Sequence, residues 1–128
     1  MYNSEKKQPL YKSFSYAFAG IFTCIRKERN MKIHCVCMLL VVIAGLFLHL
    51  SITEWCICLI LFGLILSLEL INTAIESVVD LVTVERMPLA KLAKDTAAGA
   101  VLISAIMSAI IGCIIFIPKV VSFLGIFQ

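Results

Sequence analysis

Three long apolar runs occupy most of the sequence, and they restrict it to folds that place helices in a lipid bilayer. They cover residues 33–50, 55–82 and 97–117. At a helical rise of about 1.5 Å per residue, runs of this length can cross a hydrocarbon core of about 30 Å. The chain is 62% hydrophobic with a mean hydropathy of +1.05, more than a soluble domain of 128 residues can bury. We therefore predict an all-α membrane protein that forms one domain, residues 1–128, with three transmembrane helices.

The segment before the first run predicts a helix of a different kind. Residues 10–30 mix aromatic side chains with small and polar ones, and Phe14, Phe18 and Ile21 recur at helical spacing. This pattern is typical of an amphipathic helix that lies in the membrane interface.

The distribution of positive charge predicts the orientation of the chain. Of the 11 lysines and arginines, seven precede the first run, three lie between the second and third runs, and one follows the third. Under the positive-inside rule, the N-terminus and residues 83–95 are cytoplasmic. We expect a multi-pass protein of the cell membrane whose site faces the cytoplasm. Basic residues beside a membrane attract anionic lipid, so they do not indicate nucleic-acid binding.

The second run carries polar side chains at helical spacing, and these are the strongest indication of function. They are Glu69, Asn72, Thr73, Glu76 and Asp80, which share one face of a helix. A carboxylate inside a span costs at least a few kcal/mol, so this polar stripe should face the bundle interior or an aqueous cavity. Glu76 and Asp80 could also be solvated at the helix end, whereas Glu69 is about three turns from the loop.

Clustered carboxylates repel one another, so a bound cation or a shared proton is expected. Magnesium matches best, because it prefers one or two carboxylates together with water and substrate phosphates. Lys94 and Asp95 precede the third run, where a polyanion such as a nucleotide can be held. Cysteines two residues apart, at 35 and 37 and at 56 and 58, point to different helix faces and predict no metal site.

Other known catalytic patterns are absent from the sequence. It contains no GxxxxGKS or GxxxxGKT phosphate loop and no HExxH zinc motif. Its two histidines, His34 and His49, lie near the ends of the first run and are expected at the membrane interfaces. A conventional soluble kinase or hydrolase is therefore excluded.

Several segments resemble a known family. ELINTAIESVVD at 69–80, AKDTAA at 93–98 and ERN at 28–30 are similar to the prokaryotic diacylglycerol kinases, which are small membrane enzymes. The resemblance covers about residues 12–119. Within that family, SYAFAGI at 15–21, ERNMKIH at 28–34 and PLAKLAKDTAAGAVL at 88–102 look most like the branch that phosphorylates undecaprenol.

The resemblance implies a lipid kinase that transfers the terminal phosphoryl group of ATP to the hydroxyl group of a membrane lipid alcohol. It implies that Glu69 is the general base, that Glu28 and Glu76 hold Mg²⁺, and that Asn72 helps to position Glu69. It also implies a homotrimer whose sites are shared between subunits.

The resemblance further implies a set of nucleotide contacts: Tyr16, Glu28, Glu76, Glu85, Lys94 and Asp95. The chain departs from the family pattern at two places, because Pro9 and Met87 stand where members often have an arginine and a histidine. Lys12 is a candidate substitute for the arginine and a candidate substrate contact.

Two alternatives stay open from the sequence. Diacylglycerol could replace undecaprenol as the acceptor, with the same chemistry. A small cation or proton transporter subunit could use Glu69, Glu76 and Asp80 as a relay. A relay does not need the AKD segment or Glu28, so we favour the kinase.

Overall fold

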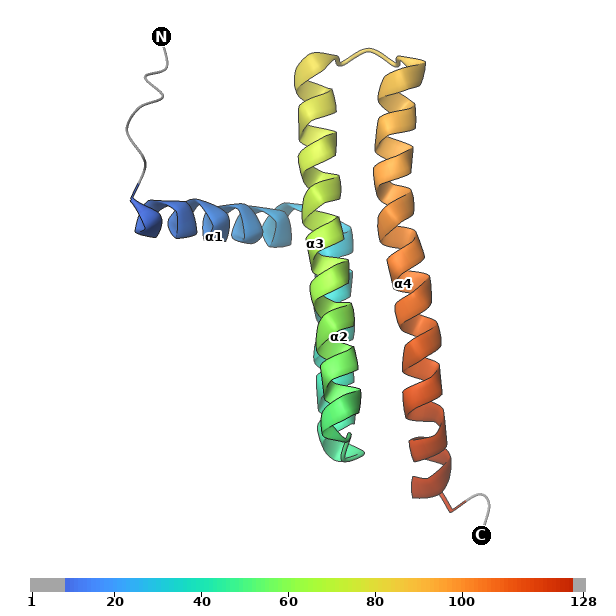
Figure 1. The fold of residues 1–128 in the computed structure, drawn as a ribbon. Helices are drawn as coiled ribbons and strands as arrows, with labels where there is room; N and C mark the ends of the chain where they lie inside the picture. Colours follow the sequence, from blue (N-terminus) through green and yellow to red (C-terminus); the bar gives the residue numbers. More distant parts are fainter. Residues whose placement is uncertain (1–8, 126–128) are drawn as a thin grey trace.

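The computed structural model describes residues 9–125, which form four helices (Figure 1). These are α1 (Leu10–Lys27), α2 (Arg29–Phe47), α3 (Ile52–Val82) and α4 (Pro88–Phe123). The helices α2, α3 and α4 are each long and apolar enough to cross a membrane. The prediction of an all-α chain is therefore confirmed, as is that of three helices with the length and composition of membrane spans.

The helix α3 is the centre of the fold, since α1, α2 and α4 all pack against it. In Figure 1, α3 and α4 run side by side and are joined by the loop of residues 83–87. The helix α2 runs along the half of α3 that is farther from this loop, and α1 extends sideways from the bundle. Within the described residues, no Cα atom of α2 comes within 8 Å of one in α4. The space between α2 and α4 is thus bridged only by side chains.

The chain turns sharply at Glu28, where the sequence predicted a helix continuing to residue 30. Glu28 has an extended backbone and separates α1 from α2, although its N–H still donates to the carbonyl of Cys24. Cys24 and Met31 lie at this corner and are almost fully buried. The predicted helix end was wrong because these buried side chains, on either side of Glu28, favour a corner over a continuous helix.

The turn between α2 and α3 lies three residues earlier in the chain than predicted. Ser51 accepts a hydrogen bond from the N–H of Glu54, and the Glu54 carboxylate accepts one from the N–H of Ser51. This capping box starts α3 at Ile52 rather than at residue 55. The first span likewise ends at Phe47 and not at residue 50, because His49 adopts a left-handed backbone with φ of 52°.

Gly45 allows the close approach of α2 and α3 at this turn. A Cβ atom at this position would lie 2.8 Å from Cη2 of Trp55. Trp55 also packs against the small core formed by Leu50, Cys58 and Ile115. A glycine is therefore required where the indole ring crosses α2.

The helix α4 extends beyond its predicted limits of 97–117 at both ends. Pro88 occupies its first turn, where the missing N–H costs nothing. Pro118 does not end it, although a proline inside a helix removes one backbone hydrogen bond. Contacts beyond the proline hold the last turn, because Lys119 pairs with Glu54 at 3.1 Å and the ring of Phe123 meets that of Phe47 at 5.2 Å.

Candidate active site

Glu69 is buried in the middle of α3, with only 1% of its surface exposed. It lines a cavity of about 240 Å³, here called the carboxylate cavity, between three helices. The lining comprises Asn30, Ile33 and His34 of α2, Glu69, Asn72 and Glu76 of α3, and Ala98, Val101 and Leu102 of α4. The polar stripe of α3 thus faces the bundle interior at these three positions.

Two polar atoms of this cavity have no hydrogen-bond partner among the described residues. They are Oε2 of Glu69 and Oδ1 of Asn72. The amide Nδ2 of Asn72 donates to Oε1 of Glu76 at 3.1 Å, so its orientation is fixed. Buried polar groups without partners cost about 1–3 kcal/mol each, so water, a cation or a ligand group is expected at these oxygens.

A chain of hydrogen bonds joins α1 to the backbone of Glu69. The hydroxyl of Thr73 donates to the Glu69 carbonyl at 3.0 Å, and the Cys24 thiol lies 3.2 Å from that hydroxyl. Because the Thr73 hydrogen is used, the thiol is the donor. Burial raises the pKa of the Cys24 thiol, which keeps it protonated for this role.

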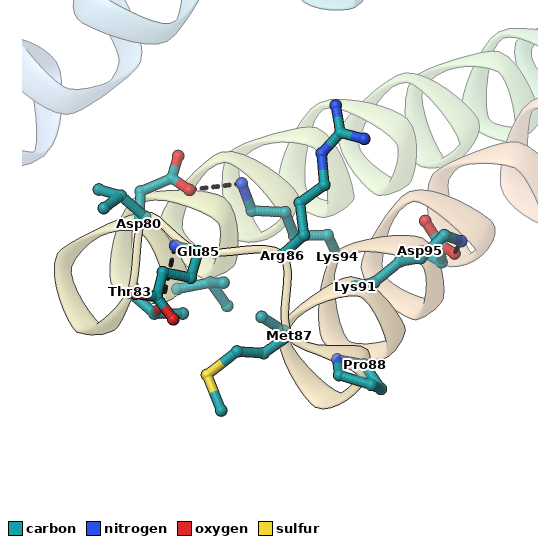
Figure 2. A pocket seen from close by; sticks show the side chains of 12 residues that line it. Asp80, Thr83, Glu85, Arg86, Met87, Pro88, Lys91, Lys94 and Asp95 are labelled. Carbon is teal, nitrogen blue, oxygen red and sulfur yellow. Dashed lines mark hydrogen bonds and ion pairs between the residues drawn. The ribbon is translucent and has the colours of Figure 1, made fainter.

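A second, more open cavity of about 650 Å³, here called the loop cavity, lies where the loop joins α3 to α4 (Figure 2). Lys94 reaches across from α4 to pair with Asp80 of α3 at 2.5 Å, and Lys91 pairs with Asp95 on α4. Arg86 makes no ion pair with a described residue, and Figure 2 shows its guanidinium pointing away from Met87. The cavity combines three cationic side chains that can contact phosphate groups.

The structure therefore divides the predicted site residues into separate groups. Glu69, Asn72 and Glu76 share the carboxylate cavity, whereas the loop cavity includes Asp80, Glu85, Lys94 and Asp95. Eleven residues of α3 separate Glu69 from Asp80, or about 16 Å at helical rise. The polar stripe that the sequence indicated is thus distributed over two cavities.

Three further predicted residues lie outside both cavities. Glu28 is at the corner of α1 and α2. Tyr16 and Lys12 are exposed on α1 and line neither cavity. One copy of the chain does not bring these two residues to the others.

His34 is a residue of the site that the sequence did not predict. It was expected at the membrane interface, but it lines the carboxylate cavity together with Glu69. Its position depends on how α2 is rotated against α3, and the uniformly apolar run around it gave no periodic signal for that rotation.

Comparison of the sequence with known proteins identifies its family. A sequence model of the prokaryotic diacylglycerol kinases matches residues 15–116. The chain belongs to the prokaryotic diacylglycerol kinase family. It is therefore a membrane lipid kinase, a phosphotransferase with an alcohol acceptor, and the transporter alternative is set aside. The family match confirms the resemblance seen in the sequence.

Individual family members cover most of the chain. An undecaprenol kinase of Bacillus subtilis is 51% identical over 109 residues, which cover 85% of this chain and 89% of that protein. A diacylglycerol kinase of Synechocystis is 41% identical over 86% of this chain and 63% of its own length. One from Helicobacter pylori is 32% identical over 80% of each chain.

Proposed function

We propose that this family member transfers the terminal phosphoryl group of ATP to the hydroxyl group of undecaprenol, at the carboxylate cavity. The observation that carries the proposal is the buried carboxylate of Glu69 with its unpartnered Oε2, since a general base needs a free acceptor within reach of the proton it takes. The acceptor is inferred from the relative with 51% identity, an undecaprenol kinase. Diacylglycerol is the second candidate, because the kinases named for it are 41% identical or less among the relatives described here.

The chemistry at Glu69 is a single displacement. The lipid hydroxyl oxygen attacks the terminal phosphorus of ATP, the bond from that phosphorus to the bridging oxygen breaks, and ADP leaves with the electron pair. Oε2 of Glu69 takes the hydroxyl proton. Asn72 restricts the rotation of the Glu76 carboxylate through their hydrogen bond. Positioning of the two reactants supplies much of the rate.

The oxygen donors of this site fit Mg²⁺. Within residues 9–125 no three acidic, histidine or cysteine side chains converge as a preformed metal site. Magnesium is commonly held by one or two carboxylates plus water and substrate phosphates, and Glu28 and Glu76 would supply those carboxylates. When bound, the metal supplies charge neutralisation on the phosphates.

The basic side chains of the loop cavity are proposed to contact the nucleotide, whose terminal phosphoryl group has to reach Glu69 about 16 Å away along α3. Lys94 is half-shielded and already paired with Asp80, so a phosphate oxygen would exchange with the Asp80 carboxylate for the same ammonium. Asp95 holds Lys91 in the same way on the outer side of α4. Glu85 lies in the loop itself. Lys94 and Lys91 are thus each held by a carboxylate until an anion binds.

Placement in the membrane follows from helix length. At a rise of about 1.5 Å per residue, α3 and α4 are about 46 and 54 Å long, well beyond a hydrocarbon core of about 30 Å. The charged loop end of both helices would then project into the cytoplasm, with α1 in the interface because its large apolar side chains are exposed. The charge count behind this orientation includes residues 1–8, which lie outside the described residues.

We further propose a homotrimer with sites shared between subunits. The apolar faces of α2, α3 and α4 are exposed in one chain, and small residues on α4 allow close packing of a second copy. Tyr16 and Lys12 would reach the carboxylate cavity of a neighbouring copy, since α1 leaves the bundle sideways at the level of the middle of α3 (Figure 1).

The proposed function is tested with purified protein in lipid nanodiscs, supplied with ATP and Mg²⁺ and one acceptor at a time. The acceptors are undecaprenol, a shorter polyprenol and diacylglycerol, and the readout is phosphate transferred to lipid. We expect the highest kcat/KM with undecaprenol. A preference for diacylglycerol would overturn the choice of acceptor, and ATP turnover without any lipid product would overturn the assignment of the cavity as the transfer site.

A further inference from the structure

A third cavity lies deeper in the bundle than the carboxylate cavity and has an apolar lining. It measures about 230 Å³ and is enclosed by side chains of α2, α3 and α4, among them Cys58, Phe62 and Ile65 of α3. Its polar lining side chains are His34 and Ser108, and the Ser108 hydroxyl donates to the carbonyl of Ser104 at 2.7 Å. An apolar cavity of this kind offers water few partners, so it favours a hydrocarbon group.

The apolar cavity adjoins the carboxylate cavity. His34 lines both of them. On α3, Ile65 precedes Glu69 by four residues and is buried on the same helix face. A lipid whose hydroxyl group lies at Glu69 would therefore have that group in the carboxylate cavity. Its adjacent carbons would lie about one helical turn further into the membrane, in the apolar cavity.

The space exists because α4 presents small side chains to it. Ala105 and Gly112 of α4 both line the cavity. A Cβ atom added at Gly112 would meet nothing within 4 Å. The backbones of α2 and α4 stay more than 8 Å apart in this region, and the exposed Cys37 of α2 lies at the rim. Between α2 and α4 the cavity is thus bounded by side chains alone, and that of Cys37 is exposed on the surface of the bundle.

We propose that this apolar cavity holds the first part of the acceptor's hydrocarbon chain, the carbons next to the hydroxyl that Glu69 deprotonates. An apolar cavity on the order of 150 Å³ accommodates a benzene molecule, so a volume of about 230 Å³ admits roughly one to two isoprene units. The remainder of a long chain would leave between α2 and α4, past the exposed Cys37. The cavity anchors the hydroxyl at Glu69 and selects acceptors by the shape of their first carbons. This inference rests on the proposed site of transfer at Glu69.

The test fills the cavity with a side chain. Gly112→Leu places a branched group in the open space, and Gly63→Leu is the matched control, because Gly63 is exposed on α3, has nothing within 4 Å and does not line the cavity. In nanodiscs, we expect Gly112→Leu to lower kcat/KM for the preferred lipid alcohol by at least about tenfold, because a mismatch of even one methylene in an apolar pocket costs about that much and leucine adds four carbon atoms. KM for ATP should not change, and the control should match the wild type.

A second measurement uses the wild-type protein and does not depend on the variant's folding. A polyprenol analogue with a photoreactive diazirine in its first isoprene unit is irradiated in the absence of ATP, and the labelled peptides are identified by mass spectrometry. We expect labels on the cavity segments around Phe62 and Ile65, and loss of these labels when undecaprenol is in excess. Labels confined to other segments would overturn the proposal.

The outcomes separate this inference from the proposed function. A wild-type preference for diacylglycerol would change the acceptor, but the ratio of variant to wild-type kcat/KM still tests the cavity with that acceptor. If Gly112→Leu alters the oligomeric state in native mass spectrometry and leaves the acceptor kcat/KM per assembled enzyme unchanged, the cavity is a contact between copies and the proposal is wrong.

Discussion

The substitution Glu69→Gln tests the assignment of the general base most directly. Glutamine has nearly the same shape as glutamate, so the carboxylate cavity keeps its volume and its neighbours. Oε2 of Glu69 has no partner among the described residues, so an amide there breaks no existing hydrogen bond. The bond from Thr73 to residue 69 goes to the backbone carbonyl and is retained. The perturbation is thus limited to loss of the proton acceptor.

The loss of one proton acceptor sets the expected decrease in rate for Glu69→Gln. A positioned general base contributes about 10²–10⁴-fold to a rate. At about 1.36 kcal/mol for each factor of ten, the barrier should rise by about 2.7–5.4 kcal/mol. Folding should be unchanged or slightly favoured, because the variant no longer buries an ionisable group at a position that is 1% exposed. The variant should therefore lose activity without losing stability.

The assay measures kcat with saturating lipid alcohol and ATP in nanodiscs, together with the melting temperature and the oligomeric state. Glu54→Gln is the control, since Glu54 lies at the far end of α3 and pairs with Lys119. We expect the control to retain its rate and to lose some stability. A Glu69→Gln enzyme within threefold of the wild-type kcat would refute the role of Glu69 as the base.

Three other outcomes are expected. Glu28→Gln and Glu76→Gln should each raise the Mg²⁺ concentration for half-maximal rate by at least about tenfold with little change in lipid KM, and an unchanged magnesium midpoint in both would remove them as ligands. Gly45→Ala should lower unfolding stability by about 1–3 kcal/mol, because its Cβ would lie 2.8 Å from the neighbouring indole ring, and a melting temperature equal to the wild type would contradict this close contact. Co-assembled Glu69→Gln and Lys94→Ala subunits should regain activity if the two residues act from different chains, whereas background activity in confirmed mixed oligomers would place each site within one chain.

The sequence predicted the helices well and their ends poorly, for identifiable reasons. Apolar length alone was enough for α2, α3 and α4, and the end of α3 at Val82 matched. The start of α3 was missed although Ser51 and Glu54 carry the S-x-x-E signature of a capping box. The passage of α4 through Pro118 had no local signal, because it depends on contacts between distant segments.

The candidate site shows the same division between local and tertiary information. The spacing of Glu69, Asn72 and Glu76 on one helix face is local, and the structure does place the three side chains in one cavity. The distance of Asp80 from them is also local, because eleven positions of helix span about 16 Å. The pairing of Asp80 with Lys94 was not foreseeable, since it depends on how α3 and α4 pack. The entry of His34 depends on the rotation of α2, which a uniformly apolar helix does not encode in its pattern.

The positions of Tyr16 and Lys12 on α1 bear on how copies of the chain would assemble around the site. Both are on α1, which extends sideways from the bundle where α2 begins, beside the middle of α3 (Figure 1). It does not approach the loop between α3 and α4. If α1 lies in the membrane interface, its far end reaches about 27 Å from the corner at Glu28, given 18 residues at about 1.5 Å each. That is far enough to pass beside a neighbouring bundle of three helices, each about 10 Å wide. A head-to-tail contact of this kind closes into a ring when every copy offers α1 to the next. Ring closure would give each carboxylate cavity a nucleotide contact that its own chain does not provide.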